Sequence, residues 1–204
     1  MKTLFIPAKI KSKINEKKIS GISKKLPKNI VIAYSVQYEN QAKKIKQILQ
    51  DSHKIIQLVQ VLGCSKINFP QNTDAVLLVS SGKFHGISLA IETSLPIYVI
   101  EENNLKKISK KEIENLKKKK KTSYLKFLHT DRIGILVSIK PGQENLKKAI
   151  EFKKNLKNKK AYLFIGNNIN TSEFENFGLD CWVNSACPRL DIENSSIVNI
   201  DKLI

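Results

Sequence analysis

The sequence predicts an α/β protein built of two similar small domains, each with a mainly parallel sheet flanked by helices. Short, continuously apolar runs alternate along the chain with amphipathic stretches. This is the order of elements that builds parallel sheets covered by helices on both faces. A lysine-rich run at residues 106–121 interrupts the alternation. The length of 204 residues suits two domains of roughly 100 residues each.

The first domain is expected at residues 29–104. Its apolar runs predict strands, and Ala42, Ile45 and Leu49 share one face of a predicted helix because their spacing follows the helical period. In chain order the expected elements are a strand at 29–34, a helix at 39–49, strands at 55–62 and 75–79, a helix at 87–93 and a strand at 96–100. Residues 1–28 before them contain an apolar opening, Leu4-Phe5-Ile6, and a lysine-rich connector.

The second domain is expected at residues 129–204 and repeats the alternation of strands and helices. Residues 105–128 between the two domains are expected to form an exposed lysine-rich helix or a linker, because so dense a charge run cannot be buried. In chain order the second domain carries a strand at 133–138, a helix at 143–156, a strand at 161–165, a short helix at 171–177, and strands at 179–184 and 197–200.

The formal net charge of +18 comes almost entirely from lysine, with arginine only at Arg132 and Arg189. Clustered lysines attract phosphate, but paired hydrogen bonding to phosphate or guanine favours arginine. Solvated helix faces are therefore the preferred explanation of the charge. A lysine-rich α/β protein that binds RNA or the ribosome remains the alternative from another functional class.

The sequence indicates a soluble, cytoplasmic protein with reduced thiols and no membrane association. No apolar stretch approaches the roughly 20 residues that a membrane-spanning helix needs, and the apolar opening before Pro7 is too short for a secretory signal. The three cysteines form an odd set without the spacing of a secreted disulfide framework.

Two cysteines, Cys64 and Cys187, each follow an apolar run and stand beside a small residue. A thiolate just past a strand lies where open α/β sheets place ligand chemistry, and cysteine is a ligand for metal clusters. Two thiolates are too few for a closed site. Cys181 is a poor third ligand, because six extended residues at about 3.3 Å each would separate it from Cys187 by roughly 20 Å. A buried core thiol is the expected role of Cys181.

Two loops between a strand and a helix could bind an anionic group through their backbone amides. They cover residues 80–86 and 138–143, and neither has the spacing of a Walker loop or a dinucleotide fingerprint. Glycine in such turns is common without any ligand. His85 in the first loop could orient a substrate, bind metal or serve as a structural histidine.

These segments together resemble the archaeal and eukaryotic diphthamide synthase family, the 2-(3-amino-3-carboxypropyl)histidine synthases of archaeal type. The resemblance covers nearly the whole chain and keeps the order and spacing of its motifs. Its main segments are Gln60-Val61-Leu62-Gly63-Cys64, Ser81-Gly82-Lys83-Phe84-His85, Pro96-Ile97-Tyr98-Val99, Gly134-Ile135-Leu136-Val137-Ser138-Ile139-Lys140-Pro141-Gly142-Gln143, Phe177-Gly178-Leu179-Asp180 and Val183-Asn184-Ser185-Ala186-Cys187-Pro188-Arg189.

The resemblance implies a three-domain architecture of which this chain carries the second and third domains. Each family domain contributes one cysteine to a 4Fe-4S cluster, so Cys64 and Cys187 are the implied ligands. The implied reaction transfers the 3-amino-3-carboxypropyl group of S-adenosyl-L-methionine to a histidine of translation elongation factor 2 by radical chemistry, the first step of diphthamide biosynthesis. No catalytic residue is assigned. The implied cofactor-binding residues are Gly82, Lys83, Phe84, His85, Lys140, Gly142, Gln143 and Arg189. For Arg189, a structural ion pair is the alternative role.

The chain departs from the family at its beginning, where residues 1–8 match only the last strand of the family's first domain. We therefore expect a partner chain to supply the first domain and the third cysteine, and both a homodimer and a heterodimer remain open. A non-catalytic supporting subunit of the same enzyme is an alternative within the family.

Overall fold

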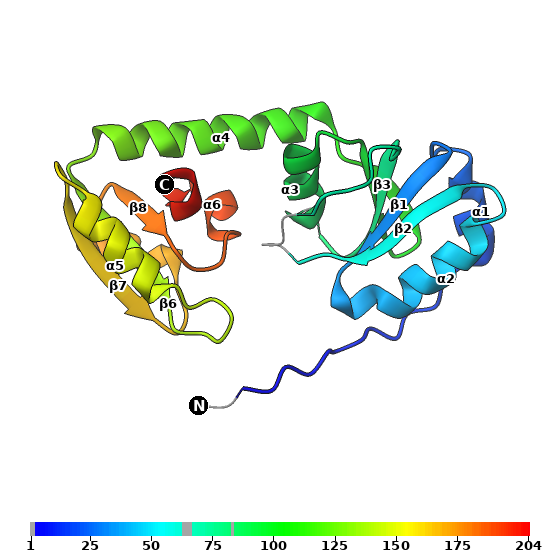
Figure 1. Cartoon of the computed structure of the whole chain (residues 1–204), viewed down its shortest axis with the longest axis horizontal. Coiled ribbons are helices and arrows are strands. Elements are labelled where there is room, and N and C mark those ends of the chain that lie inside the picture. Colours follow the sequence, from blue (N-terminus) through cyan, green and yellow to red (C-terminus); the bar gives the residue numbers. More distant parts are fainter. Residues whose placement is uncertain (1–2, 63–66, 83) are drawn as a thin grey trace. The chain divides into compact units, whose positions relative to one another are not determined.

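The computed structural model describes residues 3–62, 67–82 and 84–204. The chain divides into two compact units, Met1–Ile113 and Glu114–Ile204, which are coloured from blue to green and from green to red in Figure 1. Among the described residues, no helix is long and apolar enough to cross a membrane.

The first unit is built on a five-stranded sheet with the order β2-β1-β3-β4-β5. The first four strands run parallel, and β5 pairs antiparallel to β4 through a two-residue turn at Glu102 and Asn103. Both turn residues have positive φ, as a tight hairpin of this kind requires. The strands are β1 (Asn29–Tyr34), β2 (Lys54–Gln60), β3 (Ala75–Val79), β4 (Ile97–Glu101) and β5 (Asn104–Lys107).

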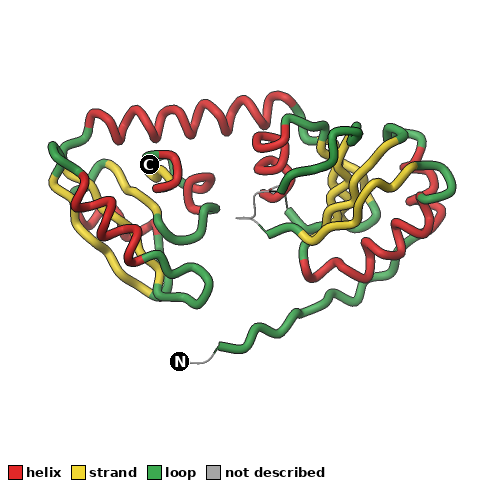
Figure 2. The backbone as a smooth tube through the Cα atoms, in the orientation of Figure 1, coloured by secondary structure: helices red, strands yellow, loops and turns green. Residues whose placement is uncertain are grey.

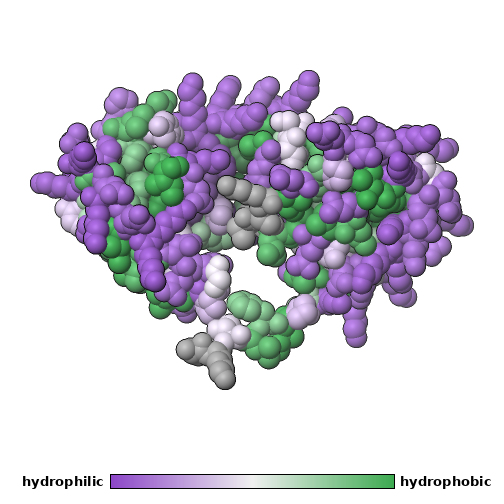
Figure 3. Space-filling view, in the orientation of Figure 1, coloured by the Kyte–Doolittle hydropathy of each residue, from purple (hydrophilic) through white to green (hydrophobic). Residues whose placement is uncertain are grey.

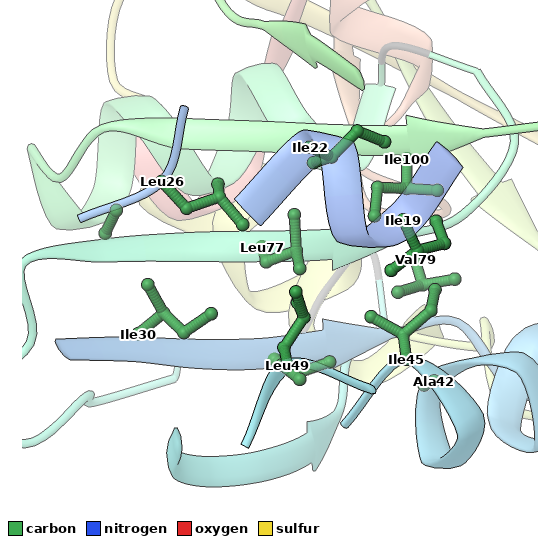
Figure 4. Close-up of a cluster of buried hydrophobic side chains, with 12 residues drawn as sticks. Ile19, Ile22, Leu26, Ile30, Ala42, Ile45, Leu49, Leu77, Val79 and Ile100 are labelled. Carbon is green, nitrogen blue, oxygen red and sulfur yellow. The ribbon is translucent and has the colours of Figure 1, made fainter. Parts of the chain in front are cut away.

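Helices cover both faces of the first sheet. On one face, α1 (Glu16–Ser23) and α2 (Glu39–Leu49) enclose a cluster of buried apolar side chains with β1 and β3, shown in Figure 4. On the other face, α3 (Phe84–Thr93) buries Leu89 and Ala90 against the strands. The short 3-10 helix η1 (Val36–Tyr38) leads from β1 into α2.

The second unit has a four-stranded, fully parallel sheet with the order β7-β6-β8-β9. One face is covered by Phe127 of α4 and by Ala149 and Phe152 of α5. The opposite face holds Trp182, which stacks on Phe174 at 4.1 Å between ring centroids. The elements are α4 (Lys110–His129), β6 (Arg132–Ser138), α5 (Leu146–Asn155), β7 (Lys160–Gly166), η2 (Thr171–Phe177), β8 (Cys181–Asn184), α6 (Leu190–Glu193), β9 (Ile197–Asn199) and η3 (Ile200–Lys202).

The parallel strands of both units follow the same order, with the first strand between the second and the third. The connections that leave the first and the third strand therefore lie on opposite sheet faces, and the carboxyl ends of these two strands form the usual ligand-binding position of an open α/β sheet. The segment after β2 leads to Cys64, whereas Cys187 follows β8. The two cysteines thus follow the second strand of one sheet and the third strand of the other.

Most predicted elements are confirmed, and the differences lie mainly in the lysine-rich segments (Figure 2). The connector before Pro27 contains α1, because Ile19 and Ile22 fall on one buried face and the Asn15 side chain caps the helix by accepting from the Lys18 amide. The segment after β4 contains β5, and α4 extends to His129. Residues 3–15, including Leu4-Phe5-Ile6, are neither helix nor strand.

The lysine-rich helix α4 is mostly exposed, as its charge predicted, but it also makes specific contacts within the second unit. Leu116, Ser123 and Phe127 of α4 are buried. The Lys119 ammonium donates to the Ile192 carbonyl, and Lys126 donates to the Ser196 hydroxyl at 3.2 Å. Charge density along the sequence could not reveal these contacts, because their partners lie about 70 residues further along the chain.

A Gly134→Ala substitution is expected to destabilise the second unit. A Cβ atom at Gly134 would lie 2.3 Å from Cε3 and Cζ3 of the buried Trp182 ring, and overpacking of this kind costs about 1–3 kcal/mol. Trp182 is the only tryptophan in the sequence, so its fluorescence during urea unfolding reports on this unit.

The matched control is Gly21→Ala in α1, where a Cβ atom would meet nothing within 4 Å. Replacing a glycine within a helix by alanine should stabilise the first unit by about 0.5–1 kcal/mol, as measured by circular dichroism. If both substitutions changed the free energy of unfolding of their units by the same amount and in the same direction, the close contact between Gly134 and Trp182 would be contradicted.

Candidate functional site

The predicted ligand Cys187 lies in the turn between β8 and α6 and is half-buried. The turn is fastened to the neighbouring strand β6 through Ser185. The backbone amide and the hydroxyl of Ser185 both donate to the Leu136 carbonyl, at 3.0 and 2.8 Å. Cys187 therefore follows a strand in the middle of the sheet, at its carboxyl end, as the sequence predicted.

The side chain of Asn184, the last residue of β8, organises this turn from inside. Its Nδ2 donates to the Cys187 carbonyl at 2.9 Å and to the Asn199 Oδ1 at 2.6 Å. Its Oδ1 accepts from the Ala186 amide at 2.9 Å. All three contacts are made by a residue that is 2% exposed, so water cannot replace them without opening the structure.

Asn199, at the end of β9, continues the network. Its Nδ2 donates to the Pro188 carbonyl at 3.1 Å and to the Asp191 Oδ2 at 2.7 Å. The same carboxylate oxygen pairs with the Lys120 ammonium of α4 at 3.0 Å. Burial raises the pKa of Asp191 above its ordinary value, and Lys120 opposes that shift without cancelling it. Desolvation thus outweighs the ion pair for this carboxyl group.

Cys181 differs from Cys187 although both belong to the same segment. It is fully buried in the core of the second unit, and burial raises the pKa of its thiol to about 11. A thiol with so high a pKa stays protonated near neutral pH and is neither a ready ligand nor a nucleophile. The expectation that Cys181 is a buried core thiol is confirmed.

The loop between β6 and α5 carries Lys140, Gly142 and Gln143. The Gln143 amide closes a turn by donating to the Lys140 carbonyl at 3.0 Å, and Gly142 adopts a φ of 80°, which favours glycine. The Lys140 amide donates to the Ser138 hydroxyl at 3.1 Å.

The structure brings this loop together with the cysteine turn. Asn145, just after the loop, donates through its Nδ2 to the Ser185 carbonyl at 2.8 Å. Arg189 is exposed and directly precedes α6, two residues beyond Cys187. Four of the predicted binding residues, Lys140, Gly142, Gln143 and Arg189, therefore lie on the two connected loops at the carboxyl ends of β6 and β8.

The predicted residues of the first unit lie after β3. Gly82 has a φ of 75°, and its amide donates to the Glu101 carboxylate at 2.8 Å. Phe84 and His85 open α3, with their rings edge to face at 5.1 Å between centroids. Lys83 and Cys64 lie outside the described residues.

The loop at Gly82 has a carboxylate-binding amide, as the sequence suggested, but the carboxylate comes from the chain itself. Glu101, at the end of β4, occupies the Gly82 amide, one of the backbone amides of the loop that could bind an anionic group. An anion at Gly82 would therefore have to displace the Glu101 side chain.

Within the described ranges, no group of three or more His, Cys, Asp or Glu side chains lies close enough to hold a metal ion. Cys187 nevertheless fits a ligand role, because the residue is only half-buried and its turn is fixed by buried side chains. The described part of the chain thus offers a single suitable thiolate rather than a complete ligand set.

Sequence reasoning missed the polar residues that hold the turn, Asn184, Asn199, Asp191 and Lys120. A signal for two of them is present, since each asparagine ends a short apolar strand, at 181–184 and 197–199. A polar residue at the carboxyl end of a buried parallel strand faces the usual ligand-binding position. No local signal identifies Lys120, whose partner Asp191 is 71 residues away in the sequence.

Comparisons with known proteins agree with the resemblance noted from the sequence. The family model described as "Putative diphthamide synthesis protein" matches residues 1–197. The chain is 29% identical over 206 residues to a 2-(3-amino-3-carboxypropyl)histidine synthase of Pyrococcus horikoshii, which covers 94% of this chain and 60% of that protein.

Two crystal structures of Dph2 from Pyrococcus horikoshii, one of them with a 4Fe-4S cluster, are similar in fold. Their TM-scores are 0.76 and 0.74, each at 26% sequence identity over 90% of this chain and 58% of the other. The predicted α/β fold class is confirmed. The chain spans about three fifths of the length of the relatives that it matches.

We expect alkylating reagents to separate the two cysteines of the second unit. In the folded chain at pH 8, iodoacetamide should modify Cys187 at least about tenfold faster than Cys181, because only thiolates react and burial disfavours the Cys181 thiolate. Peptide mass spectrometry gives both rates, and denaturant should abolish the difference. Similar rates in the folded chain would contradict the burial of Cys181.

The raised pKa of Asp191 predicts a pH-dependent contribution to stability. A folded-state pKa above the unfolded value of 3.8 means that the folded state holds the proton more tightly. The contribution of Asp191 is therefore most favourable at low pH and declines as the pH rises from about 3.8 through the raised pKa.

The variant Asp191→Asn lacks this ionisation and keeps an oxygen that can accept from Asn199. Its free energy of unfolding relative to the wild type should increase between pH 4 and pH 7, measured by urea unfolding with Trp182 fluorescence. A difference that stays constant or falls over this range would show that burial does not dominate at Asp191.

Proposed function

This chain belongs to the family of putative diphthamide synthesis proteins, and from this membership we propose that Cys64 and Cys187 are two thiolate ligands of a 4Fe-4S cluster. The observation that carries the proposal is the contrast between the two cysteines of the second unit. Cys187 is partly accessible in a turn held by buried asparagines, whereas Cys181 is sealed in the core. Thiolate ligands need access and a fixed position.

The proposed reaction is the first step of diphthamide biosynthesis. It transfers the 3-amino-3-carboxypropyl group of S-adenosyl-L-methionine to a histidine of translation elongation factor 2. When bound, the cluster supplies the electron that cleaves the sulfonium bond. The chain's own residues bind the substrate, orient it and exclude water around it.

We assign the binding of S-adenosyl-L-methionine to the two connected loops of the second unit and to the loop around Gly82. The exposed Arg189 guanidinium, two residues from Cys187, has the geometry to bind the substrate carboxylate with two parallel hydrogen bonds. Lys140 and the turn at Gly142 would add positive charge and a backbone that approaches the ligand closely. In the first unit, Lys83, Phe84 and His85 complete the proposed binding set.

The remaining thiolate of the proposed cluster comes from protein outside residues 1–204. Cys181 is the only other cysteine in the sequence, and its burial and raised pKa make it unsuitable. Leu4, Phe5 and Ile6 are 81, 72 and 79% exposed, and the segment next to the N-terminus presents apolar surface in Figure 3. Consecutive exposed apolar side chains favour contact with another protein surface, which we propose to be a partner chain.

Anaerobic reconstitution with iron and sulfide tests the proposal. A stable 4Fe-4S cluster is expected when the partner is present, and Cys187→Ala should reduce the iron content strongly. Cys181→Ala is the matched control, because it removes a thiol from the same strand segment without removing a proposed ligand. A complete cluster in the isolated 204-residue chain, or equal iron content in both variants, would contradict the proposal.

The same preparation separates a catalytic from a supporting role. Modification of elongation factor 2 that depends on Cys64 and Cys187 is expected for the catalytic role. Undiminished modification by the reconstituted Cys64→Ala complex would instead assign this chain a supporting role beside a catalytic subunit.

A further inference from the structure

We propose that Asn184, Asn199 and Asp191 are positioning residues for Cys187, forming a buried relay that fixes the cysteine turn before any cluster binds. The inference rests on the proposed role of Cys187 as a ligand and adds the residues that prepare it. The relay begins at the Cys187 and Pro188 carbonyls and ends at Lys120 of α4.

The relay is confined to groups that are removed from water. Asn184, Asn199 and Asp191 are 2, 9 and 3% exposed. A buried polar group that loses its hydrogen-bond partner destabilises the folded state by about its desolvation penalty. Hydrogen bonds within a buried network also strengthen one another. Each of the three side chains therefore depends on the others for its hydrogen bonds.

The orientation of both amides follows from their partners. Backbone carbonyls only accept hydrogen bonds, so the Nδ2 groups must face the Cys187 and Pro188 oxygens. Each Nδ2 has a second hydrogen, which it donates within the relay. Asn184 Nδ2 donates to Asn199 Oδ1, and Asn199 Nδ2 donates to Asp191 Oδ2. All four amide hydrogens of the two asparagines are thereby used.

The side-chain hydrogen bonds of the relay are made in addition to the backbone hydrogen bonds of the sheet. Asn184 and Asn199 are register partners on the adjacent parallel strands β8 and β9, whose backbones pair without the help of side chains. The amide side chains are free to hold the carbonyls of two successive turn residues. Side chains that orient a ligand-bearing segment in this way support metal affinity without touching the metal.

The far end of the relay explains why a lysine-rich helix borders this turn. Lys120 pairs with Asp191, Lys119 donates to the Ile192 carbonyl, and Ser123 donates to the Ser195 carbonyl at 2.8 Å. The part of α4 within the second unit thus holds the segment that follows Cys187 at three points. A turn fixed in advance loses less conformational freedom when it binds a ligand.

Amide hydrogen exchange in the iron-free chain tests the relay. The reporters are the Ala186 amide, which donates to Asn184, and the Leu190 amide, which donates to the Cys187 carbonyl. Asp191→Leu, a replacement of similar size that removes the acceptor for Asn199, should speed their exchange roughly tenfold, equivalent to about 1.4 kcal/mol. Asp191→Asn keeps an acceptor and should remain within about twofold of the wild type, because one net hydrogen bond is retained.

Phe174→Leu is the control for general loss of stability, because Phe174 lies in the apolar cluster with Trp182 and not in the relay. It should affect the two reporter amides less than Asp191→Leu does. Unchanged exchange in Asp191→Leu, or an equal increase in Phe174→Leu, would overturn the relay.

A second measurement links the relay to the ligand. In the cluster reconstituted with the partner, Asp191→Leu should lower iron retention and change the electron paramagnetic resonance spectrum of the reduced cluster, and Asp191→Asn should restore both. A spectrum identical to that of the wild type in Asp191→Leu would overturn the positioning role. Failure of the wild-type chain to bind a cluster with the partner would reject the proposed function. The relay would still be tested, because amide hydrogen exchange is measured in the iron-free chain.

Discussion

The parallel strand order, with the first strand of each sheet between the second and the third, is the constraint on which the rest of the structure depends. It brings the carboxyl ends of neighbouring strands to one edge and sends the connecting helices to opposite faces. In the second unit, this arrangement places the turn after β8 beside β6, so that Ser185 can bond the Leu136 carbonyl. The candidate ligand and the loop around Gly142 meet there because their strands are neighbours.

Close packing enforces this strand arrangement. Gly134 of β6 lies opposite Trp182 of β8, where a methyl group would collide with the indole ring. Trp182 in turn stacks on Phe174 and meets Phe164 edge to face. On one face of the sheet, Trp182 is therefore the central side chain of an apolar cluster and requires a glycine beside it. Two residues after Trp182, β8 ends at Asn184, where the polar turn begins. Core and site are consequently built from the same short strand.

The buried polar groups explain how so basic a chain can form a defined site. Asp191 is desolvated strongly enough to raise its pKa despite Lys120, so the ion pair by itself is no source of large stabilisation. The role of Asp191 is to orient its neighbours. It accepts a hydrogen bond from the Asn199 amide, which also donates to the Pro188 carbonyl. Glu101 acts similarly in the first unit by occupying the Gly82 amide. In both units, acidic side chains order the loops of a protein whose net charge is +18.

The sequence by itself determined the α/β class, the strands β1 and β3, the helix α2 and the contrast between Cys181 and Cys187. These features follow from short-range patterns: apolar runs, helical spacing, and a thiol inside or just beyond an apolar run. The sequence did not reveal α1 or β5, because a high local density of lysine concealed the few apolar residues that are buried in α1 or half-buried in β5. Only the tertiary structure decided that Asn184, Asn199, Asp191 and Lys120 act together. Their hydrogen bonds and ion pair join residues that are 8 to 71 positions apart. Such contacts depend on how strands and helices meet in space, so they leave no periodic pattern in the sequence.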